Sequence, residues 1–215
     1  MSPALVVAGT DTDVGKTVFS AALTAALSAN YWKPIQAGLA GETDSETVRR
    51  LAGLAPDRIF PEAYRLKAPA SPHYAAAQEG IEIDTTSLVP PRSMAPLVIE
   101  CAGGLAVPLT RTVLQIDLLA RWKLPVVLVA ATRVGTINHS LLSIEALKRR
   151  AVPILGLAFV GDEAPESARI IGELGGVRIL GSLPHIDPLN AATLHTAFAE
   201  NFKVDDILGL GAGGP

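Results

Sequence analysis

Five short runs of aliphatic residues recur along the chain, and they constrain its fold more than any other feature. They occupy residues 5–8, 97–101, 126–130, 154–160 and 177–180. The runs are apolar at consecutive positions, which is typical of strands buried on both faces of a parallel sheet. Helix-like stretches separate them, at residues 14–29, 45–54, 137–150 and 164–174. This alternation predicts a doubly wound α/β domain, with a mostly parallel sheet and helices on both faces.

The composition agrees with one globular domain. Of 215 residues, 49% are hydrophobic and only 18% are charged, which excludes a mainly disordered chain. We expect a single domain at residues 1–208 and a flexible glycine-rich tail at 209–215, with the proline-rich stretches 56–72 and 88–96 as loops around a site. The final residues read GLGAGGP.

Charge and cysteine usage bear on partners and location. The net charge of −3 provides no basic field for nucleic acid, so a nucleic-acid partner is not expected. Cys101 is the single cysteine and cannot form an internal disulfide, which suits a reducing compartment. The apolar runs have strand length and the N-terminus lacks a basic leader, so we expect a cytoplasmic protein without a membrane segment.

The loop GTDTDVGKT, residues 9–17, follows the first apolar run and leads into a helix. In such a context, backbone N–H groups and the helix N-terminus cradle phosphate oxygens, while Lys16 adds positive charge and Thr17 a hydroxyl for magnesium. The usual pattern has glycine at the position of Thr10, whereas here Gly9 stands one place earlier. The alternative is a plain turn with a surface lysine. We predict a P-loop NTPase-like nucleotide site.

Two acidic residues of this loop, Asp11 and Asp13, are unusual beside an anionic ligand. Their carboxylates repel phosphate unless they face a cation. A substrate amine would provide one. Alternatively, either residue caps the following helix or faces solvent.

Three further charged residues lie near expected strand ends. Lys33, in YWKPIQAG, follows a predicted second strand, where open α/β sheets bind ligands, and it is a candidate for stabilising a transferred phosphoryl group or a carbamate. A surface lysine is the alternative. Glu100 closes the run at 97–101 and is a candidate magnesium ligand, with a plain strand-end charge as the alternative. Asp44 is another candidate ligand, although it could instead cap the next helix.

Several blocks of the sequence together resemble the dethiobiotin synthetases of biotin biosynthesis. These blocks are GTDTDVGKT at 9–17, KPIQAG at 33–38, SPHYAAAQEG at 71–80, ECAGGLAVPL at 100–109 and RVGTINHSLL at 133–142. The resemblance implies an ATP-dependent cyclo-ligase that uses ATP and magnesium. In that reaction CO₂ adds to an amine of 7,8-diaminononanoate, ATP phosphorylates the carbamate, and the neighbouring amine closes a cyclic urea.

The resemblance also implies roles for individual residues. Magnesium would bind Thr17, Asp44 and Glu100, while Lys16 and Lys33 would be catalytic. Residues implied in ATP binding are Asp13, Val14, Gly15, Lys16, Thr17, Asp44, Glu100, Cys101, Ala102, Gly103, Leu183, Pro184 and His185. Residues implied in substrate binding are Thr12, Asp13, Ala37, Val134, Gly135, Thr136 and Asn138. The segment 134–138 would act from the partner subunit, so the resemblance implies a homodimer with its active site at the subunit interface.

The chain departs from the family pattern at two places. Ala37 stands where a hydroxyl residue is frequent, so one hydrogen bond to the substrate is either missing or supplied by the backbone. Residues 160–162 stand where many members have asparagine, so we expect relaxed adenine selectivity, with the loop 182–185 reading the base through its backbone. His73 and His139 are expected to pack or to form hydrogen bonds, and the Cys101 thiol is expected to be buried without chemistry.

Two other functions share this type of loop. The corrin amide synthases need a further glutamine-hydrolysing domain, for which 215 residues leave no room. A switch or partitioning ATPase usually carries an additional lysine early in the loop, and residues 10–13 contain none. Such a protein would also need a basic or amphipathic contact surface, which the net charge does not indicate.

Overall fold

A seven-stranded parallel sheet forms the centre of the structure, a computed structural model that describes residues 3–208. Its strands follow the order β4-β2-β6-β1-β7-β8-β9. Their bounds are β1 (Ala4–Gly9), β2 (Asn30–Trp32), β4 (Ile59–Phe60), β6 (Leu97–Gly104), β7 (Val126–Ala131), β8 (Ile154–Val160) and β9 (Ile179–Leu183). A separate parallel pair joins β3 (Ile35–Ala37) to β5 (Tyr64–Leu66). The predicted mostly parallel α/β sheet is confirmed.

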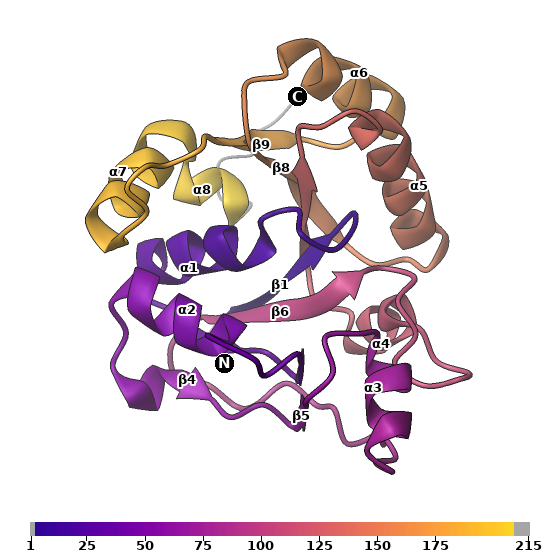
Figure 1. The fold of residues 1–215 in the computed structure, drawn as a ribbon. Helices are drawn as coiled ribbons and strands as arrows, with labels where there is room; N and C mark the ends of the chain where they lie inside the picture. The colour runs from indigo at the N-terminus through magenta and orange to yellow at the C-terminus, as the bar shows by residue number, and fades with distance from the viewer. Residues whose placement is uncertain (1–2, 209–215) are drawn as a thin grey trace.

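Helices cover both faces of this sheet (Figure 1). One face carries α1 (Lys16–Ala26), α2 (Asp44–Ala52), α7 (Ala191–Asn201) and α8 (Val204–Ile207). The other carries α4 (Gln115–Trp122), α5 (Thr136–Arg149) and α6 (Pro165–Gly175). Helix α3 (Pro72–Gln78) packs against the small sheet. Among residues 3–208, no helix combines the length and apolarity that a membrane crossing requires.

The consecutive apolar side chains of each strand point alternately to the two faces of the sheet. In β1, Leu5 and Val7 pack with α1 and α7, whereas Val6 and Ala8 pack with α4 and α5. All four side chains are buried. Successive side chains of a strand point to opposite faces, so burial of both faces needs an unbroken apolar run.

Several predicted boundaries need correction. Helix α1 begins at Lys16 rather than at position 14, and β9 spans Ile179–Leu183, so half of the predicted loop at 182–185 belongs to a strand. The stretch 56–72, predicted as loop, also contains a 3₁₀ helix η1 (Pro56–Arg58) together with β4 and β5. These strands are only two and three residues long, too short for a recognisable pattern. The predicted tail at 209–215 lies outside the described residues.

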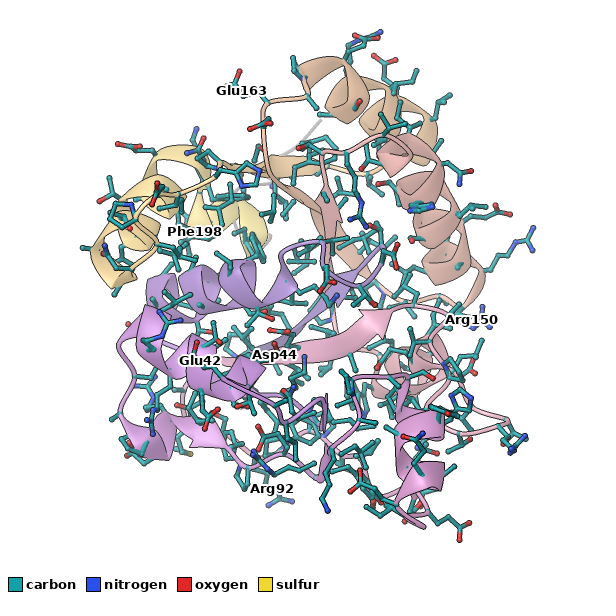
Figure 2. The ribbon with its side chains drawn as sticks, in the orientation of Figure 1. Glu42, Asp44, Arg92, Arg150, Glu163 and Phe198 are labelled. Atoms are coloured by element: carbon teal, nitrogen blue, oxygen red, sulfur yellow. The ribbon has the colours of Figure 1, made fainter. Side chains whose placement is uncertain are left out.

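The chain after β9 forms a helical cover that sequence patterns did not predict. Phe198 of α7 and Phe202 stack with ring centroids 4.7 Å apart, and both contact Phe19 of α1 at 5.9 and 5.4 Å. Figure 2 shows Phe198 directed from α7 toward α1. These aromatic contacts attach α7 and α8 to the face that carries α1.

Helix α2 is capped by Thr43, which corrects the interpretation of Asp44 as a cap. The Thr43 hydroxyl accepts from Glu46 N at 3.4 Å, and Thr43 N donates to Glu46 Oε2 at 2.7 Å. This reciprocal pair is a capping box, and it makes Asp44 the first residue of the helix. The Asp44 carboxylate is therefore free of the capping role.

We predict that Thr43→Ala lowers the free energy of unfolding by about 1 kcal/mol, because the first turn of α2 loses its cap. Urea unfolding followed by circular dichroism measures this change. Thr47→Ala is the matched control, since it deletes the same atoms from the same helix but removes only an exposed hydrogen bond to Glu42. An equal loss in both variants would contradict the capping assignment.

Candidate active site

A cavity of about 710 Å³ opens at the carboxyl ends of β1, β2 and β6. Strands β6 and β7 lie on opposite sides of β1, so the chain diverges around the end of β1, where open α/β sheets bind ligands. The predicted site residues that line the cavity are Thr12, Asp13, Gly15, Lys16, Thr17, Lys33, Ala37, Asp44, Glu100, Ala102 and Gly103. Residues from distant parts of the sequence thus meet at one edge of the sheet.

The loop between β1 and α1 is tightly wound around Lys16. The Lys16 Nζ donates to Asp11 O at 2.8 Å, and a Cβ on Gly9 would lie 2.7 Å from that same backbone oxygen. Gly9 therefore has to be glycine, although it stands one place before the usual position. Gly15 has φ +87°, and a Cβ there would lie 2.6 Å from Val160 Cγ1. Burial lowers the pKa of Lys16, partly offset by the charge of Glu100.

The two acidic residues of the loop lie in different surroundings. Asp11 Oδ1 accepts from Thr12 N at 2.8 Å, and its other oxygen lies 3.6 Å from a guanidinium nitrogen of Arg133. Asp13 borders the cavity and has φ +54°, which is uncommon for a residue other than glycine. Asp11 thus faces a cation of the protein itself, whereas Asp13 faces the cavity.

A polar cluster at the floor of the cavity joins three elements. The Thr17 hydroxyl lies 3.1 Å from Asp44 Oδ1 and 2.9 Å from Glu100 Oε1. Lys33 Nζ lies 3.0 Å from Glu100 Oε1 and also forms an ion pair with Asp44. Lys33 and Glu100 are buried, while the Asp44 side chain is about one-third exposed. In Figure 2, Asp44 lies at the start of α2, beside β6.

Strand register explains why Lys33 meets Glu100. Trp32 pairs with Ile99, so the next residues along the two strands, Lys33 and Glu100, are neighbours. Burial alone would lower the pKa of Lys33, but the adjacent carboxylates of Glu100 and Asp44 raise it above its usual value. Lys33 therefore carries a positive charge, and the interpretation as a surface lysine is wrong. Strand β6 continues to Gly104, so Glu100 lies within the strand rather than at its end.

The cluster has the chemistry of a magnesium site. Mg²⁺ prefers hard oxygen ligands, commonly one or two carboxylates, with phosphate and water completing the shell. Thr17, Asp44 and Glu100 provide one hydroxyl and two carboxylates within hydrogen-bond distance of one another. Among residues 3–208, no group of three or more His, Cys, Asp and Glu side chains forms a protein-only metal site. The donor set fits a metal that is bound together with phosphate.

Other predicted residues do not border this cavity with their side chains. Val14 and Leu183 are buried in the core beside α1, and Cys101 packs on the opposite face of the sheet, where burial raises its pKa to about 12. The side chains of these three residues therefore do not face the cavity, and their predicted role in ATP binding stays a prediction that only their backbone could fulfil. Pro184 and His185 are exposed beyond β9.

The segment proposed to act across an interface lies at the start of α5. Val134, Gly135 and Asn138 are exposed, whereas Thr136 is buried with no hydrogen-bond partner for its Oγ1. The His73 Nδ1 lies 2.9 Å from Ser71 Oγ, in agreement with a hydrogen-bonding role. His139 is exposed on α5, so its side chain does not pack in the core of this chain.

Sequence reasoning missed several residues of the cavity wall. Gln36 is buried there, and its Oε1 accepts from Asp44 N at 3.3 Å, which helps to fix the start of α2. Residues 69–72 also line the cavity, as expected for a loop around a site. The other such stretch, 88–96, instead borders a separate cavity beside Trp122. The quoted blocks contained Gln36 and Ser71, but no charge or spacing distinguished them.

Comparison with known proteins decides the family. A family model described as an AAA domain matches residues 3–193. The ATP-dependent dethiobiotin synthetase BioD of Nitrobacter hamburgensis is 61% identical over 208 residues, which cover 97% of this chain and 98% of that protein. The chain belongs to the dethiobiotin synthetase family. Its relative of the same name in Afipia carboxidovorans is 60% identical over 207 residues, covering 96% of this chain and 99% of that protein.

Solved structures show the same fold in more distant proteins. The septum site-determining protein MinD of Pyrococcus horikoshii, complexed with Mg-ADP, aligns with a TM-score of 0.57 and 17% identity. The alignment covers 99% of this chain and 97% of that one. This likeness confirms the P-loop NTPase-like fold. At 17% identity it shows nothing about the function of this chain. The full-length synthetase relatives confirm the family that the sequence blocks resembled, and a partitioning ATPase is not favoured.

We predict that Lys33→Ala lowers the free energy of unfolding by roughly 3–5 kcal/mol, because Glu100 is left as an uncompensated buried charge. Chemical denaturation at neutral pH measures the loss. Lys67→Ala, at an exposed lysine, is the control and should change stability by less than about 0.5 kcal/mol. If Lys33→Ala matched that control, the buried ion pair would not be needed by the fold.

Proposed function

We propose that this member of the dethiobiotin synthetase family forms dethiobiotin from 7,8-diaminononanoate, CO₂ and ATP in the cavity described above. One amine of the diamine attacks CO₂ and loses a proton, which gives a carbamate. A carbamate oxygen then attacks the γ-phosphorus and ADP leaves. The second amine attacks the carbamoyl carbon, phosphate leaves, and the cyclic urea is complete. The cluster of buried Lys33 and Glu100 with Asp44 and Thr17, beside a phosphate-binding loop, carries this proposal.

Lys16 and the N-terminus of α1 bind the nucleotide phosphates. Gly15 has a left-handed backbone and makes no side-chain cap, so no capping side chain occupies the first N–H groups of the helix. A phosphate there gains backbone donors and the positive end of the helix dipole. The lowered pKa of Lys16 reflects burial, and a bound phosphate would favour its charged form.

Thr17, Asp44 and Glu100 hold Mg²⁺ together with the nucleotide. When bound, this ion neutralises phosphate charge during transfer. Lys33 offsets one of the two negative charges of Asp44 and Glu100, and its ammonium borders the cavity where the carbamate would meet the γ-phosphate. It stabilises the negative charge that develops during the transfer.

Asp13 and Thr12 bind the amine end of the diamine. Both border the cavity that Lys33 also lines, and the Asp13 carboxylate makes no ion pair among the described residues. A cationic or hydrogen-bonding amine would compensate its charge beside the phosphates. Ala37 offers the substrate only its backbone and a methyl group, in place of the hydroxyl that is frequent in the family.

Residues 183–185 border the base of the nucleotide through their backbone. Gly161 N donates to Leu183 O at 2.9 Å, which joins the ends of β8 and β9. Val160, at the end of β8, contacts Gly15 of the phosphate loop. Without an asparagine in residues 160–162, adenine is selected only weakly.

Product formation tests the proposed function directly. Purified protein is incubated with 7,8-diaminononanoate, bicarbonate, Mg²⁺ and ATP, and dethiobiotin is detected by mass spectrometry. The proposal requires dethiobiotin and one phosphate for each ATP consumed. ATP hydrolysis that neither the diamine nor bicarbonate accelerates would contradict it and favour a switch ATPase.

Lys16→Ala is expected to lower kcat by roughly 10²–10³-fold, because a preorganised positive charge is lost from the transition state. Steady-state kinetics at saturating ATP and diamine measure the change, and circular dichroism shows whether the fold is retained. Lys67→Ala, at an exposed lysine away from the cavity, should retain wild-type kcat. A folded Lys16→Ala enzyme with wild-type turnover would remove Lys16 from the mechanism.

We also propose that the active site is completed by a second copy of the chain. Val134 is fully exposed, and Ile137 and Leu142 of α5 are exposed as well, which is typical of an interaction surface. Gly135 caps α5 without a side-chain hydrogen bond, so the start of this 14-residue helix is a suitable anion site. In a homodimer, this segment would bind the substrate carboxylate of the other subunit.

Val134→Asp is expected to weaken dimerisation at least tenfold, since a charge enters the proposed interface. Sedimentation velocity over a concentration series measures the dissociation constant. The KM for 7,8-diaminononanoate should rise, whereas the KM for ATP should not. Leu174→Asp is the matched control, because Leu174 is an exposed leucine on the neighbouring helix α6. A monomeric wild-type protein would contradict the dimer.

A further inference from the structure

Tyr31 is buried against Glu100, and no sequence pattern indicated a role for it. The side chain is completely inaccessible, and its hydroxyl donates to Glu100 Oε2 at 3.0 Å. Its ring packs in the core beneath α1. A phenol with one buried hydrogen bond to a carboxylate differs from an ordinary core aromatic residue, because its polar atom selects one orientation of its partner.

The two oxygens of Glu100 have separate partners. Oε1 accepts from Thr17 at 2.9 Å and from Lys33 at 3.0 Å, and both of these residues line the cavity. Oε2 accepts from Tyr31, which does not line the cavity. Rotation of the carboxylate would break the Tyr31 bond and turn the cavity-facing oxygen away.

Strand geometry explains how Tyr31 reaches this oxygen. Tyr31 pairs with Val98 across β2 and β6, and Glu100 lies two residues further along on the same face. Lys33 lies two residues beyond Tyr31, also on that face. The phenol and the ammonium therefore approach Glu100 from one neighbouring strand.

We propose that Tyr31 is a positioning residue that holds Glu100 Oε2, so that Oε1 stays directed toward the magnesium site. This inference rests on the proposed role of Glu100 as a metal ligand. Partners that orient a metal-ligating carboxylate typically change metal affinity about 10–100-fold when they are removed. Tyr31 thus affects metal binding without contacting the metal, the nucleotide or the substrate.

Tyr31→Phe tests this role, because it removes one oxygen and retains the buried ring. Mn²⁺ is titrated against the full-length protein in the presence of ADP, and free Mn²⁺ is measured by electron paramagnetic resonance. We expect the dissociation constant of Mn²⁺ to rise roughly 10-fold or more. In steady-state assays, the Mg²⁺ concentration for half-maximal rate should rise, while kcat at saturating Mg²⁺ stays close to that of the wild type.

Tyr64→Phe is the matched control. Its hydroxyl also makes a hydrogen bond, accepting from Asp84 N at 2.9 Å, but it lies outside the cavity. This variant should bind Mn²⁺ like the wild type. Melting temperatures of both variants are recorded in parallel, so that a loss of stability is separated from a change in metal binding.

The outcomes separate the two proposals. If wild-type protein binds Mn²⁺ and Tyr31→Phe binds it equally well, Tyr31 is only a structural residue and this inference is wrong, while the metal site stands. If wild-type protein with ADP does not bind Mn²⁺, the proposed metal site and the role of Tyr31 both fail. A similar loss of Mn²⁺ affinity in Tyr64→Phe would also overturn the inference, because the effect would not be specific to Glu100.

Discussion

The buried carboxylate of Glu100 is the constraint on which the site depends. A charge inside a central strand has a large desolvation cost, which only close partners can offset. Lys33, Thr17 and Tyr31 supply those partners, from the end of β2, the first turn of α1 and the middle of β2. The same contacts that make the charge tolerable also bring the phosphate loop, the lysine and the carboxylates together. Stability and site geometry therefore have a common origin in this cluster.

The parallel sheet and the helix starts orient the side chains of this cluster toward one another. Parallel strands bring their carboxyl ends to one edge, and alternation along β6 directs Glu100 to the face of α1 while Cys101 packs on the other face. The capping box places the cap at Thr43, one residue before the first helical residue Asp44, which leaves the Asp44 carboxylate available for Thr17 and Lys33. Close packing at Gly9 and Gly15 lets the loop turn tightly around Lys16.

Some proteins share only the fold of this chain, whereas others match its sequence over almost the full length. MinD of Pyrococcus horikoshii has the same fold at 17% identity, whereas the synthetase relatives match almost the full chain at about 60%. Fold alone does not decide function, because function resides in the side chains at the site. Here the proposed binding of the second substrate rests on two features outside the Gly-Lys-Thr triplet, the acidic residue Asp13 at the cavity and the exposed apolar start of α5.

The class of fold, the phosphate loop and the family all follow from local patterns of residues. Unbroken apolar runs follow from burial on both faces, and a Gly-Lys-Thr triplet after a strand has few other uses. Other features of the structure cannot be predicted from local sequence patterns. Short strands such as β4, the aromatic contacts of α7 and the choice of Thr43 over Asp44 as cap depend on contacts between distant segments. The role of Tyr31 is the clearest case. A tyrosine in an apolar strand looks like core, and only the register of β2 against β6 brings its hydroxyl to Glu100.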